Sequence, residues 1–284
     1  MRNLFRGLMA ASLLALAPLA AEAGVSIGVS VNIAPPVLPV YAQPAIPAAG
    51  YIWTPGYWAW APTGYYWVPG TWVMPPSVGL LWTPGYWGWS SGAYLWHGGY
   101  WGPHIGFYGG VNYGFGYGGV GYEGGYWRGN QFMYNTTVSN VRTINVTNVY
   151  TRTVVNAGTV NRVSFNGGAG GIAARPTPAE LSAAHEQHVA FTSEQRTHET
   201  LARNDQSLRA SVNGGHPAIA ATARPGAFNG HGVMAARGPG SPGGAPQQPY
   251  AGHAPGAAPQ QGGHPGAGHE PHENHGEHEG QGRR

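Results

Sequence analysis

The N-terminal part of the chain alternates apolar with small or polar residues. The apolar positions are Val25, Ile27, Val29, Val31 and Ile33. This period of two predicts a strand with one apolar face. Five prolines then fall within residues 34–50 and predict a stiff, extended linker. We therefore assign residues 24–50 to a strand, which either joins a larger sheet or remains frayed, followed by a Pro-rich linker.

Four aromatic hexapeptides dominate the next fifty residues. Each has the pattern Trp, two residues, Gly, one residue, Trp, and their starts lie 14, 15 and 14 residues apart. So regular a spacing of the rarest residue type indicates an internal repeat. The repeat residues are Trp53, Gly56, Trp58, Trp67, Gly70, Trp72, Trp82, Gly85, Trp87, Trp96, Gly99 and Trp101.

The chemistry of the first hexapeptide predicts a hairpin turn. Pro55 presets φ at the second position of a type II turn, and Gly56 accepts the positive φ of the third. The aromatic flanks favour strands. In this interpretation the two tryptophans of each hexapeptide, such as Trp53 and Trp58, face each other across the ladder. Type II turns match strand twist poorly, so a wider loop with an offset pair is the alternative.

The remaining patterns extend this into a mainly β fold, a short-strand antiparallel meander over residues 51–134. Residues 61–64 and 90–92 are predicted turns between the hexapeptides. A Gly-rich aromatic stretch follows, and residues 127–134 are interpreted as a last, degenerate hairpin of the repeat. Since Leu, Ile and Val are scarce here, we expect Trp and Tyr to form the core and more than half of the repeat tryptophans to be packed.

Three further segments follow the repeats. Residues 135–172 are rich in Asn, Thr and Val, which favours extended structure. Residues 173–213 predict two polar helices, one starting after Thr177 with Glu180 at the third position, the other after Thr192 with Gln195 reaching back and running to about Ala210. These are surface helices or a partner-docking arm. Residues 214–284 have almost no large apolar side chains, which predicts a disordered tail.

The segment 1–23 has the pattern of an export signal. Arg2 and Arg6 precede an apolar run over residues 8–19, and small residues allow cleavage between Ala23 and Gly24. The alternative is an uncleaved anchor, although the run is short for a bilayer span of about 20 residues. We therefore expect an exported protein, located in the periplasm, at the outer membrane or outside the cell, that does not span the membrane after cleavage.

The hexapeptides resemble the bacterial YXWGXW or WXXGXW repeat proteins, which are sometimes labelled BcpO-related. The likeness is close over residues 51–134 and continues into the segments behind them. It implies an exported envelope or secreted protein and offers no catalytic residues to transfer. Some relatives resemble lipoproteins, but this chain contains no Cys for lipid attachment.

Charge and motif content bear on the function class. The chain has 14 basic and 11 acidic residues, and no basic residue is Lys. This near-balance argues against nucleic-acid binding, which needs a dense basic face. There is no Cys nucleophile, nucleophile elbow, zinc-protease motif or phosphate loop, which argues against an enzyme.

Two function classes compete on these patterns. The first is a structural or interaction protein of the cell envelope, with an envelope protein as partner or with self-association through aromatic strand edges. The second is a carbohydrate- or peptidoglycan-binding module that presents flat aromatic side chains to sugar rings. The residues predicted to contact such a ligand are Trp60, Trp89, Tyr65 and Tyr94.

The tail carries a third hypothesis, weak binding of Cu, Ni or Zn; no other cofactor is expected. His269, His272, His275 and His278 recur every third residue, interleaved with glutamates. A polyproline II chain has three residues per turn, so these imidazoles would line one side. Imidazole and carboxylate suit these divalent ions. The alternative is a solvated tail whose histidines only gain charge as the pH falls.

Overall fold

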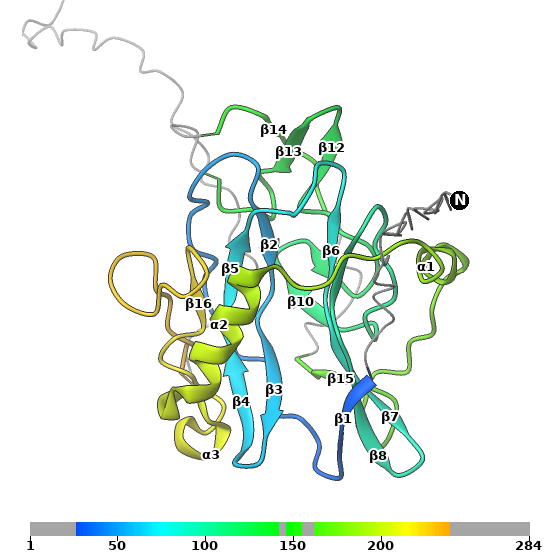
Figure 1. Ribbon diagram of the computed structural model, residues 1–284, viewed down its shortest axis with the longest axis vertical. Coiled ribbons are helices and arrows are strands. Elements are labelled where there is room, and N and C mark those ends of the chain that lie inside the picture. The colour runs from blue at the N-terminus through cyan, green and yellow to red at the C-terminus, as the bar shows by residue number, and fades with distance from the viewer. Residues whose placement is uncertain (1–26, 142–145, 155–161, 239–284) are drawn as a thin grey trace, which may run out of the picture. The chain divides into compact units, whose positions relative to one another are not determined.

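Two long hairpins, each containing two hexapeptides, organise the structure, a computed structural model that describes residues 27–141, 146–154 and 162–238 (Figure 1). The first hairpin consists of β2 (Ile52–Thr54), β3 (Tyr57–Ala61), β4 (Gly64–Val68) and β5 (Gly70–Val73). The second consists of β6 (Leu81–Thr83), β7 (Tyr86–Ser90), β8 (Ala93–His97) and β9 (Tyr100–Gly102). The predicted mainly β architecture of short antiparallel strands is therefore confirmed.

The strands pair between hexapeptides and not within them. In the first hairpin, β2 pairs with β5 and β3 with β4. In the second, β6 pairs with β9 and β7 with β8. The facing tryptophans are Trp53 with Trp72, Trp58 with Trp67, Trp82 with Trp101 and Trp87 with Trp96. The predicted pairing within each hexapeptide is wrong.

The Pro-Gly step interrupts a strand without reversing it. The φ of Gly56 lies outside the left-handed range that a type II turn requires at its third position. The chain instead reverses at the spacers, where Gly64 has φ 104° and Ser91 and Gly92 have φ 50° and 88°. The turns predicted at residues 61–64 and 90–92 are confirmed, because Gly and short polar residues accept these angles at low cost.

The N-terminal segment forms part of the packed structure. β1 (Ile27–Val31) pairs antiparallel with β8, so this strand joins the sheet. The proline-rich stretch behind it buries Leu38 and Ile46, and the carbonyl of Pro44 accepts the indole N–H of Trp72 at 2.9 Å. Prolines fit this stretch because its backbone donor bonds come from other residues: the N–H of Leu38 donates to the carbonyl of Arg162, and that of Ile46 to the carbonyl of Asn140.

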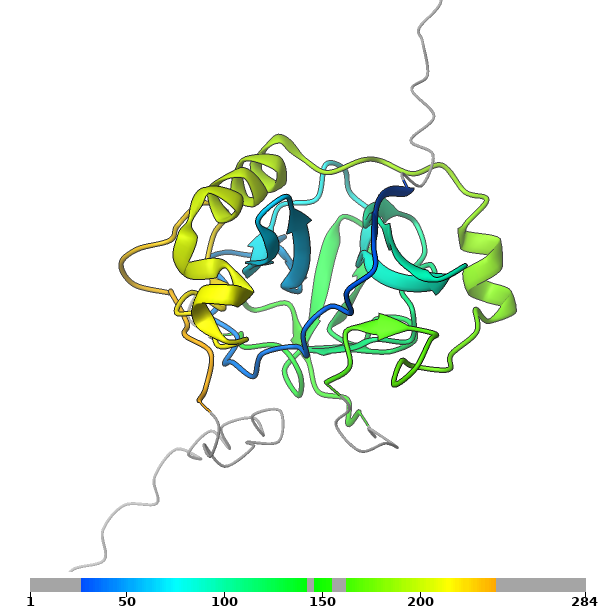
Figure 2. The same cartoon turned by 90° about the horizontal axis from the view of Figure 1, so that it is seen from below.

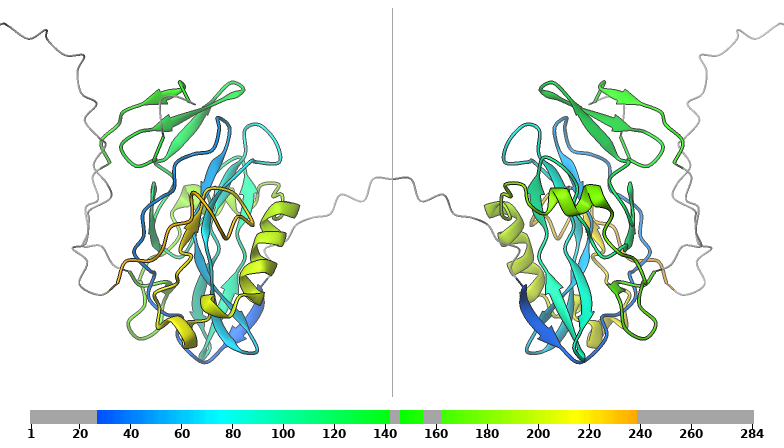
Figure 3. Two further views of the ribbon diagram at one scale, coloured as in Figure 1. Left: turned by 90° about the vertical axis from the view of Figure 1, so that its left-hand side faces the viewer. Right: turned by 90° about the vertical axis from the view of Figure 1, so that its right-hand side faces the viewer.

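The glycine-rich stretch forms further short strands. They are β10 (Asn112–Gly114), β11 (Tyr117–Gly118), β12 (Gly125–Arg128) and β13 (Gln131–Asn135). The predicted last hairpin is confirmed, because β12 and β13 are antiparallel with Trp127 opposite Phe132. β14 (Val149–Tyr150) pairs parallel to β13, and the three strands form a separate small sheet at the upper end of the views in Figures 1 and 3. β15 (Phe165–Asn166) adds parallel to β7.

Two capped helices follow, α1 (Pro178–Ala183) and α2 (Ser193–Asn204). Thr177 with Glu180, and Thr192 with Gln195, form the expected capping boxes. The second helix stops earlier than expected and is followed by η1 (Gln206–Leu208) and α3 (Ala210–Asn213). α2 packs against β4 and lies in front of the first hairpin in Figure 1, as the view in Figure 2 also shows.

The predicted disorder from residue 214 onward is wrong for residues 214–238. β16 (Ala221–Thr222) pairs parallel to β5, and its residues are fully buried. The backbone bonds to β5 and the small size of these side chains let a segment without large apolar residues pack. The signal segment, with Ala23 and Gly24, and the four tail histidines lie outside the described residues.

Aromatic side chains form most of the core. Seven of the eight hexapeptide tryptophans are buried, and Trp96 is half-buried, so the expectation that more than half are packed is confirmed. Within the described residues, none of the helices has the length and apolarity needed to cross a bilayer.

Candidate functional site

The four hexapeptides meet at one buried point, which we call the hexapeptide junction. It lies where the strands of both hairpins are interrupted and where α2 crosses them. A small cavity marks it, lined from the hairpins by Thr54, Pro55, Tyr57, Val68, Pro69, Thr71, Trp82, Pro84, Gly85 and Trp96. Tyr113, Phe191, Gln195 and His198 complete the lining from later segments.

Each hexapeptide glycine receives an indole from the facing hexapeptide. A Cβ added at Gly70 would lie 2.6 Å from Cζ2 of Trp53, and one at Gly99 would lie 2.5 Å from Cζ2 of Trp82. The reciprocal contacts, Trp67 on Gly56 and Trp96 on Gly85, are equally close. The motif needs glycine because a side chain there would occupy the space of the partner indole.

The facing tryptophans also interact through their rings. Trp58 and Trp67 have centroids 5.2 Å apart at 66°, and Trp53 and Trp72 lie 5.3 Å apart at 67°. Such edge-to-face pairs are worth about 0.5–1.5 kcal/mol beyond their buried area. The hexapeptide is therefore a device for locking two antiparallel strands together without a disulfide.

Hydrogen bonds and a stacked aromatic pair join the two hairpins to each other. The indole N–H of Trp87 donates to the carbonyl of Trp58 at 2.8 Å, and Tyr57 stacks on Trp96 at 5.0 Å. The buried hydroxyl of Tyr117 lies 2.8 Å from the carbonyl of Trp82 and 3.3 Å from that of Trp53. Those two carbonyls occupy the same place in the two hairpins.

α2 closes the junction with polar side chains. Oε1 of Gln195 accepts the indole N–H of Trp101 at 2.8 Å and the backbone N–H of its own cap, Thr192, at 2.9 Å. Nε2 of His198 lies 2.8 Å from the carbonyl of Pro69, and Nδ1 lies 2.8 Å from the backbone nitrogen of Gly226. Because a backbone N–H can only donate, Nδ1 accepts and Nε2 carries the proton.

Burial sets the ionisation of the groups under α2. It lowers the pKa of His198 to about 4, and the hydrogen bond to the carbonyl of Pro69, which raises the pKa, offsets only part of this effect. Burial also raises the pKa of Glu199, opposed by the Tyr57 and Tyr66 hydroxyls. Desolvation likewise raises the pKa of Tyr57 well above its ordinary value. At neutral pH the imidazole is uncharged, which suits a buried site.

The junction is built for packing and leaves little room for a ligand. Its cavity has a volume of about 20 Å³, enough for about one water molecule. Small-molecule pockets usually have a volume of about 300 Å³ or more. Oε1 of Gln195 and both ring nitrogens of His198 already have protein partners.

The four residues predicted to contact a ligand divide into two kinds. Trp60 is half-buried and Trp89 is 39% exposed, whereas Tyr65 and Tyr94 are only 5% and 6% exposed. Each tyrosine packs edge-on against its tryptophan across the hairpin, at 4.8 Å for Trp60 and 4.7 Å for Trp89. Tyr65 and Tyr94 are therefore core residues, and the expectation that they present an aromatic face is wrong.

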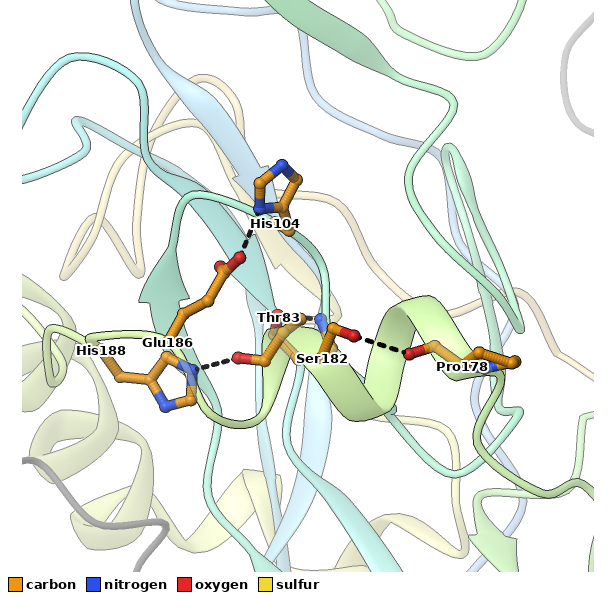
Figure 4. A network of polar contacts seen from close by, with 8 residues as sticks. Thr83, His104, Pro178, Ser182, Glu186 and His188 are labelled. Carbon is orange, nitrogen blue, oxygen red and sulfur yellow. Dashed lines mark hydrogen bonds and ion pairs between the residues drawn. The ribbon is translucent and has the colours of Figure 1, made fainter.

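A second polar cluster surrounds the end of α1 (Figure 4). His104 Nδ1 lies 2.7 Å from the Glu186 carboxylate, and the ring of His188 stacks on Tyr100 at 3.7 Å while its Nε2 contacts the carbonyl of Ala183. His104 is largely exposed, so this contact contributes at most about 1 kcal/mol. No group of three or more metal-ligating side chains occurs in the part of the chain that the structure describes.

Sequence reasoning did not find Gln195 and His198 as junction residues. They are polar, so an apolar periodicity gives no sign of the helix face that α2 buries, which consists of Gln195, His198 and Ala202. Their spacing of three and four residues was the one available signal, since such positions share a helix face. Leu201, which apolarity would have chosen, is 43% exposed.

The fold and junction define a β protein built on duplicated aromatic hairpins. A sequence model of the WXXGXW repeat matches the chain in two copies, at residues 49–73 and 78–101. The chain thus carries two WXXGXW repeats, consistent with the WXXGXW-repeat family. Each copy corresponds to one hairpin with both of its hexapeptides. Comparison with curated proteins and with solved structures finds no match.

Proposed function

We propose that this chain is a non-enzymatic, exported protein of the cell envelope with a structural or interaction role. The observation that carries this is the use of the hexapeptides: their tryptophans and glycines lock together the strands within each hairpin, and the junction between the hairpins encloses almost no free volume. A lock of this kind suits a chain without Cys, because packing replaces the disulfides on which small exported domains often depend.

Cell fractionation tests this proposal. The native protein should be recovered from the periplasm, the outer membrane or the medium, with Gly24 as its first residue. In-cell crosslinking with mass spectrometry then identifies an envelope protein or a second copy of the chain as partner. Recovery in the cytoplasm with residues 1–23 intact would refute the export part of the proposal.

Binding of carbohydrate or peptidoglycan is the alternative. It is supported by the half-exposed Trp60 and the exposed Trp89, which stand at equivalent places in the two hairpins. Their rings offer apolar surface for sugar faces. Full-length protein should then be retained on insoluble polysaccharide or murein sacculi, and a Trp60→Ala, Trp89→Ala double variant should be released. Failure of the unmodified protein to bind any of these supports would end this alternative.

A further inference from the structure

The strongest unassigned feature is an open cleft beside the first turn of α2, which shares no lining residue with the hexapeptide junction. It has a volume of about 280 Å³ and is lined by Tyr51, Ser193, Glu194, Thr197, Arg224 and Pro225. We refer to it as the Arg224 cleft. Its volume is close to the lower end of the range for small-ligand pockets, which is about 300 Å³.

Arg224 is fixed in this cleft by an aromatic side chain. Its guanidinium lies over the Tyr51 ring at 5.5 Å from the centroid, and Nη1 donates to the Tyr51 hydroxyl at 3.2 Å. Its backbone is also held, because its carbonyl accepts from the hydroxyl of Thr222 at 2.9 Å. Yet in the described ranges no carboxylate lies within ion-pair distance of this exposed arginine. A positioned guanidinium without an anionic partner is a recognition group for carboxylates.

The rest of the lining adds neutral donors and one acceptor. Ser193 and Thr197 are exposed, and neither hydroxyl bonds to another described residue. The exposed Glu194 carboxylate offers acceptor oxygens. Its negative charge disfavours a multiply charged anion such as phosphate. The cleft therefore suits a small ligand with one carboxylate and neighbouring hydroxyl groups.

We infer that the Arg224 cleft binds a carboxylate-bearing sugar unit. Arg224 binds the carboxylate, Ser193 and Thr197 bond to it or to ring hydroxyls, and Glu194 accepts from a ring hydroxyl. This inference is independent of the exposed tryptophans at the hairpin tips.

Calorimetry with the full chain tests it, with glucuronate as the probe and glucose and acetate as comparisons. Glucuronate should bind more tightly than either comparison, because only it carries both groups. Arg224→Ala should weaken binding about tenfold or more, the usual effect of losing a charged hydrogen bond. Tyr51→Phe should weaken it less, since the ring remains but the hydroxyl that orients Nη1 is lost. Arg128→Ala, which removes an exposed arginine of β12, is the matched control and should leave binding unchanged.

Three results would overturn the inference. One is the absence of glucuronate binding, and a second is equal affinity in the Arg224→Ala and unmodified proteins. The third is acetate or glucose binding as tightly as glucuronate. Circular dichroism of each variant separates a lost site from a lost fold.

Discussion

Acid should destabilise the described part of the chain through one buried side chain, His198. The residue is 3% exposed, and both ring nitrogens are engaged, one with the carbonyl of Pro69 and one with the N–H of Gly226. Adding a proton at Nδ1 breaks the bond from Gly226 and places a charge in the core. Protonation is therefore opposed by lost hydrogen bonding as well as by desolvation.

The size of the effect follows from the pKa difference. Burial lowers the pKa of His198 to about 4 in the folded chain, from an ordinary value of 6.5. Between these two pH values the unfolded chain binds more protons than the folded chain does. The contribution of neutral His198 to stability is therefore fully present above pH 6.5 and is lost as the pH falls toward 4. The full difference corresponds to about 3 kcal/mol, and about 2.5 kcal/mol is lost by about pH 4.5.

Glu199 acts in the opposite direction, so the measurement needs a matched variant. Burial raises the pKa of the Glu199 carboxyl, so the contribution of Glu199 to the stability of the folded chain decreases as the pH rises through the folded-state pKa. His198→Gln keeps a donor and an acceptor in similar places but does not titrate. Glu199 is present in both proteins, and its contribution cancels in the comparison.

The assay is urea unfolding followed by tryptophan fluorescence at about pH 7.5 and about pH 4.5. The unmodified protein should lose about 2.5 kcal/mol more between the two conditions than His198→Gln does. Equal losses would refute the assignment of acid sensitivity to this histidine. A large loss of stability for the variant already at neutral pH would show that Gln does not reproduce the two hydrogen bonds.

Three further predictions concern the hexapeptides, a helix cap and the tail. Gly99→Ala should destabilise the fold by about 1–3 kcal/mol in the same urea assay, because the new Cβ would lie 2.5 Å from Trp82 and close to backbone atoms that cannot move. Gly102→Ala is the control and should cost under about 1 kcal/mol, because its nearest neighbour lies at 3.4 Å. Similar costs for the two variants would contradict the packing of an indole on each hexapeptide glycine. Thr192→Ala should cost about 1 kcal/mol, and Thr192→Ser should cost less, if the capping box stabilises α2; thermal unfolding of both checks this. Calorimetric titration of Cu or Zn should give heat with the full chain that weakens at acid pH and is absent from a version ending at Gly268, and equal heats from both versions would exclude the tail as the site.

The sequence alone determined the features that depend on neighbouring residues. Glycine and short polar residues at residues 61–64 and 90–92 specified the chain reversals, because the required φ angles are local properties. The cap residues Thr177 and Thr192 marked the starts of α1 and α2, since a cap and its third residue bond within one turn. The regular tryptophan spacing likewise showed that aromatic strands repeat.

Only the tertiary structure decided which tryptophans face each other. Pairing within a hexapeptide and pairing between hexapeptides both preserve the alternation along each strand, so the local pattern does not separate them. The spacing from Trp53 to Trp82 equals that from Trp67 to Trp96, which was the sign that the unit holds two hexapeptides. The choice itself rests on an indole filling the space above a distant glycine. Residues 214–238 are ordered because β16 pairs with the edge of β5 that β2 leaves free. His198 is buried because α2 packs on the hairpins. Neither environment exists before the chain folds.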